Sequence, residues 1–152
     1  MRATVLAGAA AIAAASIAVW AFWPDSIDRA DAADARLVAA GEPLYRQHCA
    51  SCHGGTLEGE PDWRTRKPSG RLPAPPHDAT GHTWHHADAQ LFALTKFGAK
   101  PPLVPPGYES DMIGFGEILT DREIWAVLAY IKSTWPPDVR GHQSRVDAAS
   151  RK

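Results

Sequence analysis

The chain has 152 residues and a formal net charge of −1 at pH 7, with both signs of charge mixed along its length. This balance excludes a nucleic-acid-binding surface, which needs clustered positive charge. The length predicts one domain with flanking segments rather than two domains. The 13 prolines and 12 glycines predict a compact fold that is rich in loops.

The first 24 residues predict a membrane anchor. No charged residue occurs between Arg2 and the end of an apolar run at Trp23, and a helix of that length can cross a hydrocarbon core of about 30 Å. The run ends in bulky aromatic residues, which are typical of a membrane interface, instead of the small residues of a cleavage site. We therefore expect residues 1–24 to be a retained anchor, with a cleaved signal sequence as the alternative, and residues 25–35 to be an acidic linker.

Either fate of this segment exports the rest of the chain. The expected location is the cytoplasmic membrane, which the chain crosses once, with its main domain in the periplasm or on the outer face. If the segment is cleaved, the alternative is a soluble periplasmic protein. The positive charge before the apolar run agrees with this orientation.

The first helix of the main domain is predicted over residues 35–48, because apolar residues recur at helical spacing between Leu37 and Tyr45. Pro43 fits best in the first turn of a helix, which moves the expected start toward Gly41. A glycine inside a helix costs about 1 kcal/mol relative to alanine, so Gly41 is expected to have a packing reason.

The run Cys49-Ala50-Ser51-Cys52-His53 follows this helix directly. A Cys-x-x-Cys-His run is the attachment signature of c-type haem. Two thiols at this spacing can add to the two vinyl groups of one porphyrin, and the neighbouring histidine then lies under the iron as its axial ligand. The sequence therefore predicts one covalently bound haem c, attached through Cys49 and Cys52 and ligated by His53.

Other interpretations of the cysteine pair fit less well. A redox dithiol is expected beside a βαβ pattern, and the sequence has none. A zinc site needs further ligands, but 24 residues separate Cys52 from His77, where roughly 12–15 are expected. The chain has two cysteines, so no wider disulfide framework exists.

Glycines and prolines predict a loop over residues 54–83. A helix is predicted next, from about Asp88 to Phe97. Gly98 is its expected C-terminal stop.

Met112 is the only methionine besides the initiator. It follows a proline-rich strap over residues 99–107. Its flanks are polar and rich in glycine, which indicates a loop that approaches the haem and not a methionine of the hydrophobic core. A thioether is a known axial ligand of haem iron, so Met112 is predicted as the second ligand.

The last predicted helix begins at a capping box formed by Thr120 and Glu123 and ends at Trp135, which two prolines follow. Its apolar residues form one stripe at helical spacing. Residues 138–152 are predicted as a polar, disordered tail.

From Gly41 to Trp135, the sequence resembles the class I monohaem cytochromes c, in a bacterial, membrane-anchored branch. The resemblance rests on the attachment run, on the glycine and tyrosine before it, on the methionine loop and on the aromatic residues of the last helix; the segment from Gly81 to His86 is similar to one in that branch. It implies an all-α cytochrome c fold over residues 36–137, with three main helices around one haem and a close crossing of the first and last. A transmembrane helix would precede this domain.

The resemblance also implies two contacts around the cofactor. A backbone carbonyl of Pro75 or Pro76 would accept the Nδ1 proton of His53 and orient its ring. The indole Nε1–H of Trp84 would suit a haem propionate, and core packing is the equally weighted alternative.

Four histidines, His77, His82, His85 and His86, fall within ten residues. Imidazoles suit copper, so one interpretation is a second metal site. Solvated loop histidines are the favoured interpretation, because no cysteine, methionine or carboxylate pattern accompanies them.

The predicted function is an electron carrier that passes single electrons between respiratory or periplasmic redox partners. With His53 and Met112 as axial ligands, it has no catalytic residues and needs no small-molecule substrate. Other redox proteins or membrane respiratory complexes are the expected partners. The alternatives are a haem enzyme or ligand sensor with an open distal site, and a copper-binding or delivery protein that uses the His77–His86 cluster.

Overall fold

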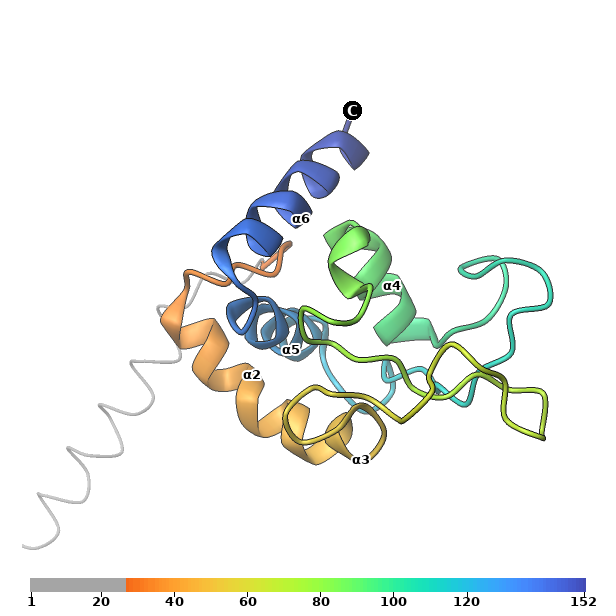
Figure 1. The fold of residues 1–152 in the computed structure, drawn as a ribbon. Helices are drawn as coiled ribbons and strands as arrows, with labels where there is room; N and C mark the ends of the chain where they lie inside the picture. Colours follow the sequence, from red (N-terminus) through yellow and green to blue (C-terminus); the bar gives the residue numbers. More distant parts are fainter. Residues whose placement is uncertain (1–26) are drawn as a thin grey trace, which may run out of the picture.

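The computed structural model describes residues 27–152, and within that range its regular elements are helices without any β-strand. The predicted all-α class is therefore confirmed. In chain order the elements are α2 (Ala35–His48), α3 (Ala50–His53), the 3-10 turn η1 (Thr83–His85), α4 (Asp88–Phe97), α5 (Asp121–Ser133) and α6 (Pro137–Ser150). Two long loops, residues 54–82 and 98–120, join these helices. Figure 1 shows α5 in the middle of the molecule, with α2 and α4 beside it and much of the two long loops on one side.

Helix α2 covers the whole predicted range. It begins at Ala35 because the side chain of Asp34 caps it and accepts hydrogen bonds from the backbone N–H groups of Arg36 and Leu37 at 2.9 and 3.2 Å. Pro43 lies inside the helix instead of in its first turn. The expectation of a later start near Gly41 was therefore wrong, because the cap stabilises a turn that the proline does not reach.

Gly41 is where α2 and α5 approach each other. A Cβ atom at Gly41 would overlap the backbone carbonyl of Ala126 and lie 3.0 Å from the Cβ of Tyr130. One turn further along α2, Tyr45 is fully buried, and its ring centroid lies 5.5 Å from that of Tyr130. The packing reason expected for Gly41 is thus the close crossing of these two helices.

We predict that Gly41→Ala destabilises the protein by about 1–3 kcal/mol, because the added methyl group meets rigid helix backbone. Helix propensity alone would predict the opposite sign. Urea unfolding of the wild type, of this variant and of a control variant would measure the differences in the free energy of unfolding. Gly55→Ala is the matched control, because a Cβ there has no neighbour within 4 Å. Equal stability of the two variants would contradict the crossing.

Helix α4 has the predicted boundaries, and α5 starts at the predicted capping box but ends at Ser133, two residues before the predicted end. Gly98 ends α4 at φ 85°, and its backbone N–H donates to the carbonyl of Leu94. The predicted capping box starts α5: the Thr120 hydroxyl accepts from the Glu123 backbone N–H, and the Glu123 carboxylate accepts from the Thr120 backbone N–H. The two helices pack through hydrophobic and aromatic side chains.

The predicted disorder of residues 138–152 is wrong. Helix α6 runs from Pro137 to Ser150, and its Gln143 is fully buried. A proline at the first position suits a helix start. No apolar stripe in the sequence marks this helix, and polar contacts fix it to the domain.

The carboxylate of Asp88 makes these contacts. Its side chain is 5% exposed, and one oxygen accepts hydrogen bonds from Lys132 Nζ at 2.6 Å and Gln143 Nε2 at 2.7 Å. The other oxygen accepts from the backbone N–H of Ala30 at 3.3 Å. Ala30 is itself buried, so this part of the predicted acidic linker packs on the domain instead of being a solvated spacer. Asp88 thus joins the N-terminal segment, α4, α5 and α6.

Asp88→Asn should cost about 3 kcal/mol, because it leaves the Lys132 ammonium buried without its counter-charge. Asp121→Asn is the control. Asp121 also begins a helix, and its carboxylate also pairs with a lysine of another helix, but its side chain is 60% exposed. That change should cost under about 1 kcal/mol. Equal losses in thermal unfolding would show that burial does not matter at Asp88.

The predicted membrane location is corrected by the structure. Among residues 27–152, no helix is both long and apolar enough to cross a membrane. The longest have 14 residues, about 21 Å of helix against a hydrocarbon core of about 30 Å. This finding contradicts the single-pass location with a periplasmic domain, and the segment 1–24 that suggested it lies outside the described residues.

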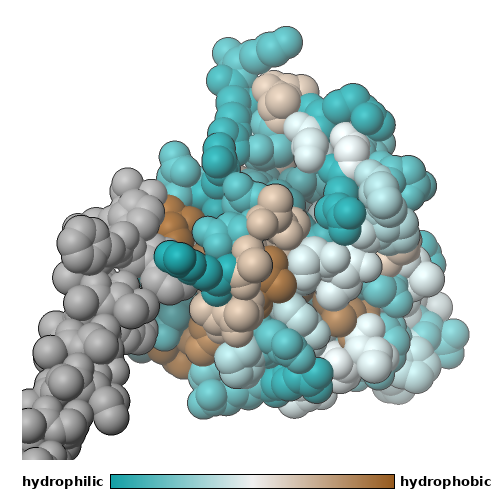
Figure 2. Space-filling model, turned by 90° about the vertical axis from the view of Figure 1, so that its left-hand side faces the viewer, coloured by the Kyte–Doolittle hydropathy of each residue, from teal (hydrophilic) through white to brown (hydrophobic). Residues whose placement is uncertain are grey.

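The hydrophobic core lies mainly between the helices. Its fully buried large side chains include Leu37, Tyr45, Ile124 and Trp135. On the face that Figure 2 shows, hydrophilic residues predominate and hydrophobic ones form small separate groups. An isolated parallel bridge between Leu72 and Ser110 joins the two long loops.

Candidate functional site

The attachment run forms a tight helical turn at the end of α2. Cys49 caps α2 through its backbone N–H, which donates to the Tyr45 carbonyl at 2.9 Å, and the N–H of His53 donates to the Cys49 carbonyl at the same distance. Both thiols are free; Cys49 is half-buried and Cys52 is exposed. Three residues apart in a helical turn, the two cysteines lie on one side of it.

His53 is buried, at 7% exposure, and its Nδ1 lies 2.8 Å from the carbonyl oxygen of Pro75. A carbonyl only accepts hydrogen bonds, so Nδ1 carries the proton in this contact. The lone pair is then on Nε2, to which no described residue hydrogen bonds. Burial lowers the pKa of His53, although the hydrogen bond to Pro75 opposes this effect. The ring is therefore neutral near pH 7, which is the state that binds a metal.

The loop after His53 is tied back to the turn. The hydroxyl of Tyr45 donates to the Gly54 carbonyl at 2.9 Å, and the backbone N–H of Gly59 donates to the His53 carbonyl at 2.7 Å. Gly59 has φ 69°, and a Cβ atom there would lie 2.7 Å from the carbonyl carbon of Pro75. Glycine is required at this position so that the loop can approach the proline whose carbonyl meets His53.

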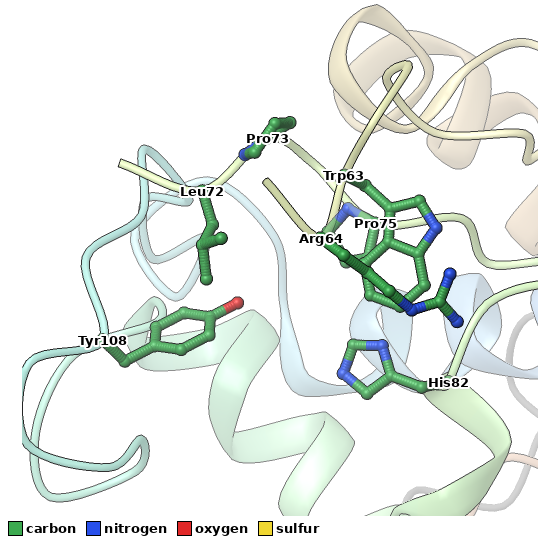
Figure 3. Close-up of a pocket in the computed structure, with 7 residues that line it drawn as sticks. All are labelled: Trp63, Arg64, Leu72, Pro73, Pro75, His82 and Tyr108. Carbon is green, nitrogen blue, oxygen red and sulfur yellow. The ribbon is translucent and has the colours of Figure 1, made fainter. Parts of the chain in front are cut away.

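Pro75 also lines a cavity of about 230 Å³. Its lining residues come from both long loops: Trp63, Arg64, Leu72, Pro73, Pro75, His82 and Tyr108. Figure 3 shows the hydroxyl of Tyr108 pointing into it, opposite the group formed by Trp63, Arg64 and His82. Sites for whole drug-sized ligands measure roughly 300–1,000 Å³, so this cavity has room for the edge of a large planar ligand.

Three polar side chains in this cavity are suited to an anion. The guanidinium of Arg64 lies 3.9 Å from the centroid of the Trp63 ring, on which His82 also stacks at 5.2 Å. His82 Nδ1 is buried and makes no hydrogen bond among the described residues. Burial, together with the neighbouring cationic groups, lowers the pKa of His82, and burial raises the pKa of Tyr108. A carboxylate in the cavity would meet the guanidinium of Arg64 and the hydroxyl of Tyr108.

The sequence does not identify Arg64, His82 and Tyr108 as residues of one site. They lie in loops without hydrophobic periodicity, 18 and 26 residues apart in succession. No local spacing therefore marks them as neighbours.

Met112 is half-buried in a loop that is fixed to the end of α4. Its backbone N–H donates to the Ser110 hydroxyl at 3.1 Å, and its carbonyl accepts from the N–H of Ala99 at 3.3 Å. The bridge between Leu72 and Ser110 brings this loop to the wall of the cavity. The pairing of Met112 with His53 as axial ligands stays a prediction.

Trp84 uses its donor within the chain. Its Nε1–H donates to the carbonyl of Ala79 at 3.3 Å, and its ring stacks on His85 with centroids 3.7 Å apart. This placement agrees with the packing alternative and leaves the propionate contact of Trp84 without support.

The four clustered histidines do not form one ligand set. His77 stacks on His53 and His85 stacks on Trp84, whereas His82 and His86 meet edge to face. Burial and the nearby His53 and His82 hold the pKa of His77 well below its ordinary value. Among residues 27–152, no group of three or more His, Cys, Asp or Glu side chains could hold a metal ion. The second metal site is therefore not supported.

A family model described as cytochrome c matches residues 38–135, which is more than half of the chain. The chain therefore belongs to the cytochrome c family. Comparisons with curated proteins and with solved structures find no significant match. Members of this family bind haem c covalently and in general carry electrons instead of catalysing reactions, so this chain is a haem-binding electron carrier in that general sense.

The described residues fit such a cofactor. Two free thiols precede a neutral imidazole whose unprotonated nitrogen has no partner in the described chain. Pro75, which orients this imidazole, also lines a cavity that carries the guanidinium of Arg64. These are the donors that a doubly tethered, nitrogen-ligated haem requires.

In the chain without cofactor, we predict that iodoacetamide at pH 8 alkylates Cys52 more than tenfold faster than Cys49. The pKa of Cys49 is raised to about 11, mainly by burial and to a smaller extent by the charge of the neighbouring Cys52. Little thiolate therefore forms at Cys49. Mass spectrometry of Cys49→Ser and Cys52→Ser variants would give the rate of each remaining thiol. The difference should vanish in urea, and equal rates in the folded chain would contradict the burial of Cys49.

Proposed function

We propose that this protein is a monohaem electron carrier of the class I type, with His53 and Met112 as axial ligands and Cys49 and Cys52 as thioether attachments. The observation that carries this proposal is the buried His53, oriented by the Pro75 carbonyl at 2.8 Å and directly preceded by two free thiols. When bound, the haem iron supplies one-electron exchange between its ferric and ferrous states.

The chain's own residues hold and tune this group. Nδ1–H of His53 donates to Pro75, which fixes the tautomer and makes Nε2 a stronger donor toward a metal. The turn of α3 presents both thiols on one side, and the buried Tyr45 fixes that turn through its bond to Gly54.

The cavity supports a place for the carboxylate edge of the cofactor. Arg64 supplies a positive charge there, and His82 and Tyr108 supply donors. Arg64 is exposed, so its attraction for the anionic edge is the modest one of a solvent-accessible ion pair.

The proposed partners are other redox proteins. Filling of both axial positions by protein side chains leaves no site for a small-molecule substrate, and electron exchange then needs only approach of a partner to the cofactor. The net charge of −1 gives no support for a nucleic-acid partner.

Acid–acetone extraction and intact mass test the attachment. The wild type should keep its colour in the protein fraction and show the mass of one haem. The Cys49→Ala/Cys52→Ala double variant should lose both. Extraction of the colour from the wild type would refute covalent attachment.

Met112→Ala should abolish the long-wavelength absorption band that a sulfur ligand gives to ferric haem, and it should lower the midpoint potential, because a thioether favours the ferrous state. The reduced variant should bind carbon monoxide rapidly. Ile113→Ala is the control, because this neighbouring side chain is 59% exposed. A wild type that lacks the band and binds carbon monoxide at once would instead favour an enzyme or sensor with an open site.

A further inference from the structure

The ring of His77 lies almost parallel to the ring of His53. Their centroids are 3.9 Å apart and their planes differ by 22°. We propose that His77 is a positioning residue that sets the plane of the His53 imidazole; this inference rests on the proposed role of His53 as axial ligand.

The His77 ring can do this because it is itself held in place. Its Nδ1 lies 2.8 Å from the hydroxyl oxygen of Thr83 in η1. Its backbone carbonyl accepts the indole N–H of Trp135 at 2.7 Å, and its backbone N–H donates to the carbonyl of Leu57 at 2.8 Å. Three separate segments of the chain therefore fix the backbone and the ring of His77.

The stack and the hydrogen bond to Pro75 restrain different movements. The hydrogen bond fixes the direction in which Nδ1 points, but it allows the ring to turn about the line that joins Nδ1 to the carbonyl oxygen. A flat ring against one face opposes that turn, because tilting His53 would separate the two surfaces. Pro75 and His77 are two residues apart, so one short segment supplies both restraints.

The plane of an axial imidazole matters for the metal that it binds. Contacts beyond the ligand itself orient the ligand and tune the metal. A ring held in one plane gives a single electronic environment at the iron, whereas a ring free to turn gives a distribution.

The test uses the haem-loaded full chain and three variants: His77→Phe, which keeps a flat ring; His77→Leu, which keeps apolar volume without one; and Thr83→Val, which removes the hydrogen bond to the ring. Low-temperature electron paramagnetic resonance of the ferric protein reports the ligand plane, and a redox titration reports the midpoint potential. His85→Leu is the matched control, because it removes a stacked histidine of the same segment that contacts Trp84 instead of His53.

We expect His85→Leu to keep the wild-type spectrum. His77→Phe keeps the flat ring but loses the hydrogen bond to Thr83, so it should broaden the low-field signal no more than Thr83→Val does. His77→Leu should broaden the low-field signal and shift the midpoint potential, and Thr83→Val should broaden the signal with the stack retained. If His77→Leu does not fold, the Thr83→Val spectrum decides. A wild-type signal and potential in both, with covalent haem and axial ligation intact, would overturn the role of His77. Loss of covalent haem from the wild type would instead refute the proposed function.

Discussion

The close crossing of α2 and α5 at Gly41 places both halves of the site. Because a glycine allows α2 to approach the backbone of Ala126, the next turn of α2 buries Tyr45 against α5. Tyr45 then fixes the attachment turn through the Gly54 carbonyl. Two residues beyond the end of α5, the indole N–H of Trp135 donates to the carbonyl of His77. The packing of α2 on α5 therefore holds both His53 and His77, although neither residue lies where the two helices cross.

The loops around the site have no regular structure, yet they are fixed at specific points. Gly59 allows one loop to approach Pro75, whose carbonyl meets His53, and the bridge between Leu72 and Ser110 joins that loop to the one that carries Met112. Prolines restrict the backbone of these segments and so reduce the conformational entropy that ordering them costs. The result is a mainly apolar cavity that also carries Arg64, His82 and Tyr108, built from residues of the two loops.

Helix α6 is fixed by a different kind of interaction. The buried carboxylate of Asp88 gathers an ammonium, an amide and a backbone N–H from three other segments. A buried ion pair adds little net stability but penalises arrangements that leave its charges unpaired. Asp88 therefore specifies where α6 and the segment around Ala30 lie, more than it strengthens the domain.

Local signals in the sequence determined α2, α4, α5 and the attachment chemistry, but not α6. Asp34 was not recognised as a cap, but Thr120, Glu123 and Gly98 were, because each acts within one turn of its own helix. Cys49, Cys52 and His53 are likewise contiguous, so their chemistry needs no knowledge of the fold. Tertiary structure alone decided the stack of His77 on His53, the cavity around His82 and the docking of α6. These depend on contacts between residues far apart in sequence, whose side chains carry no periodicity, and only the packing of the helices brings them together.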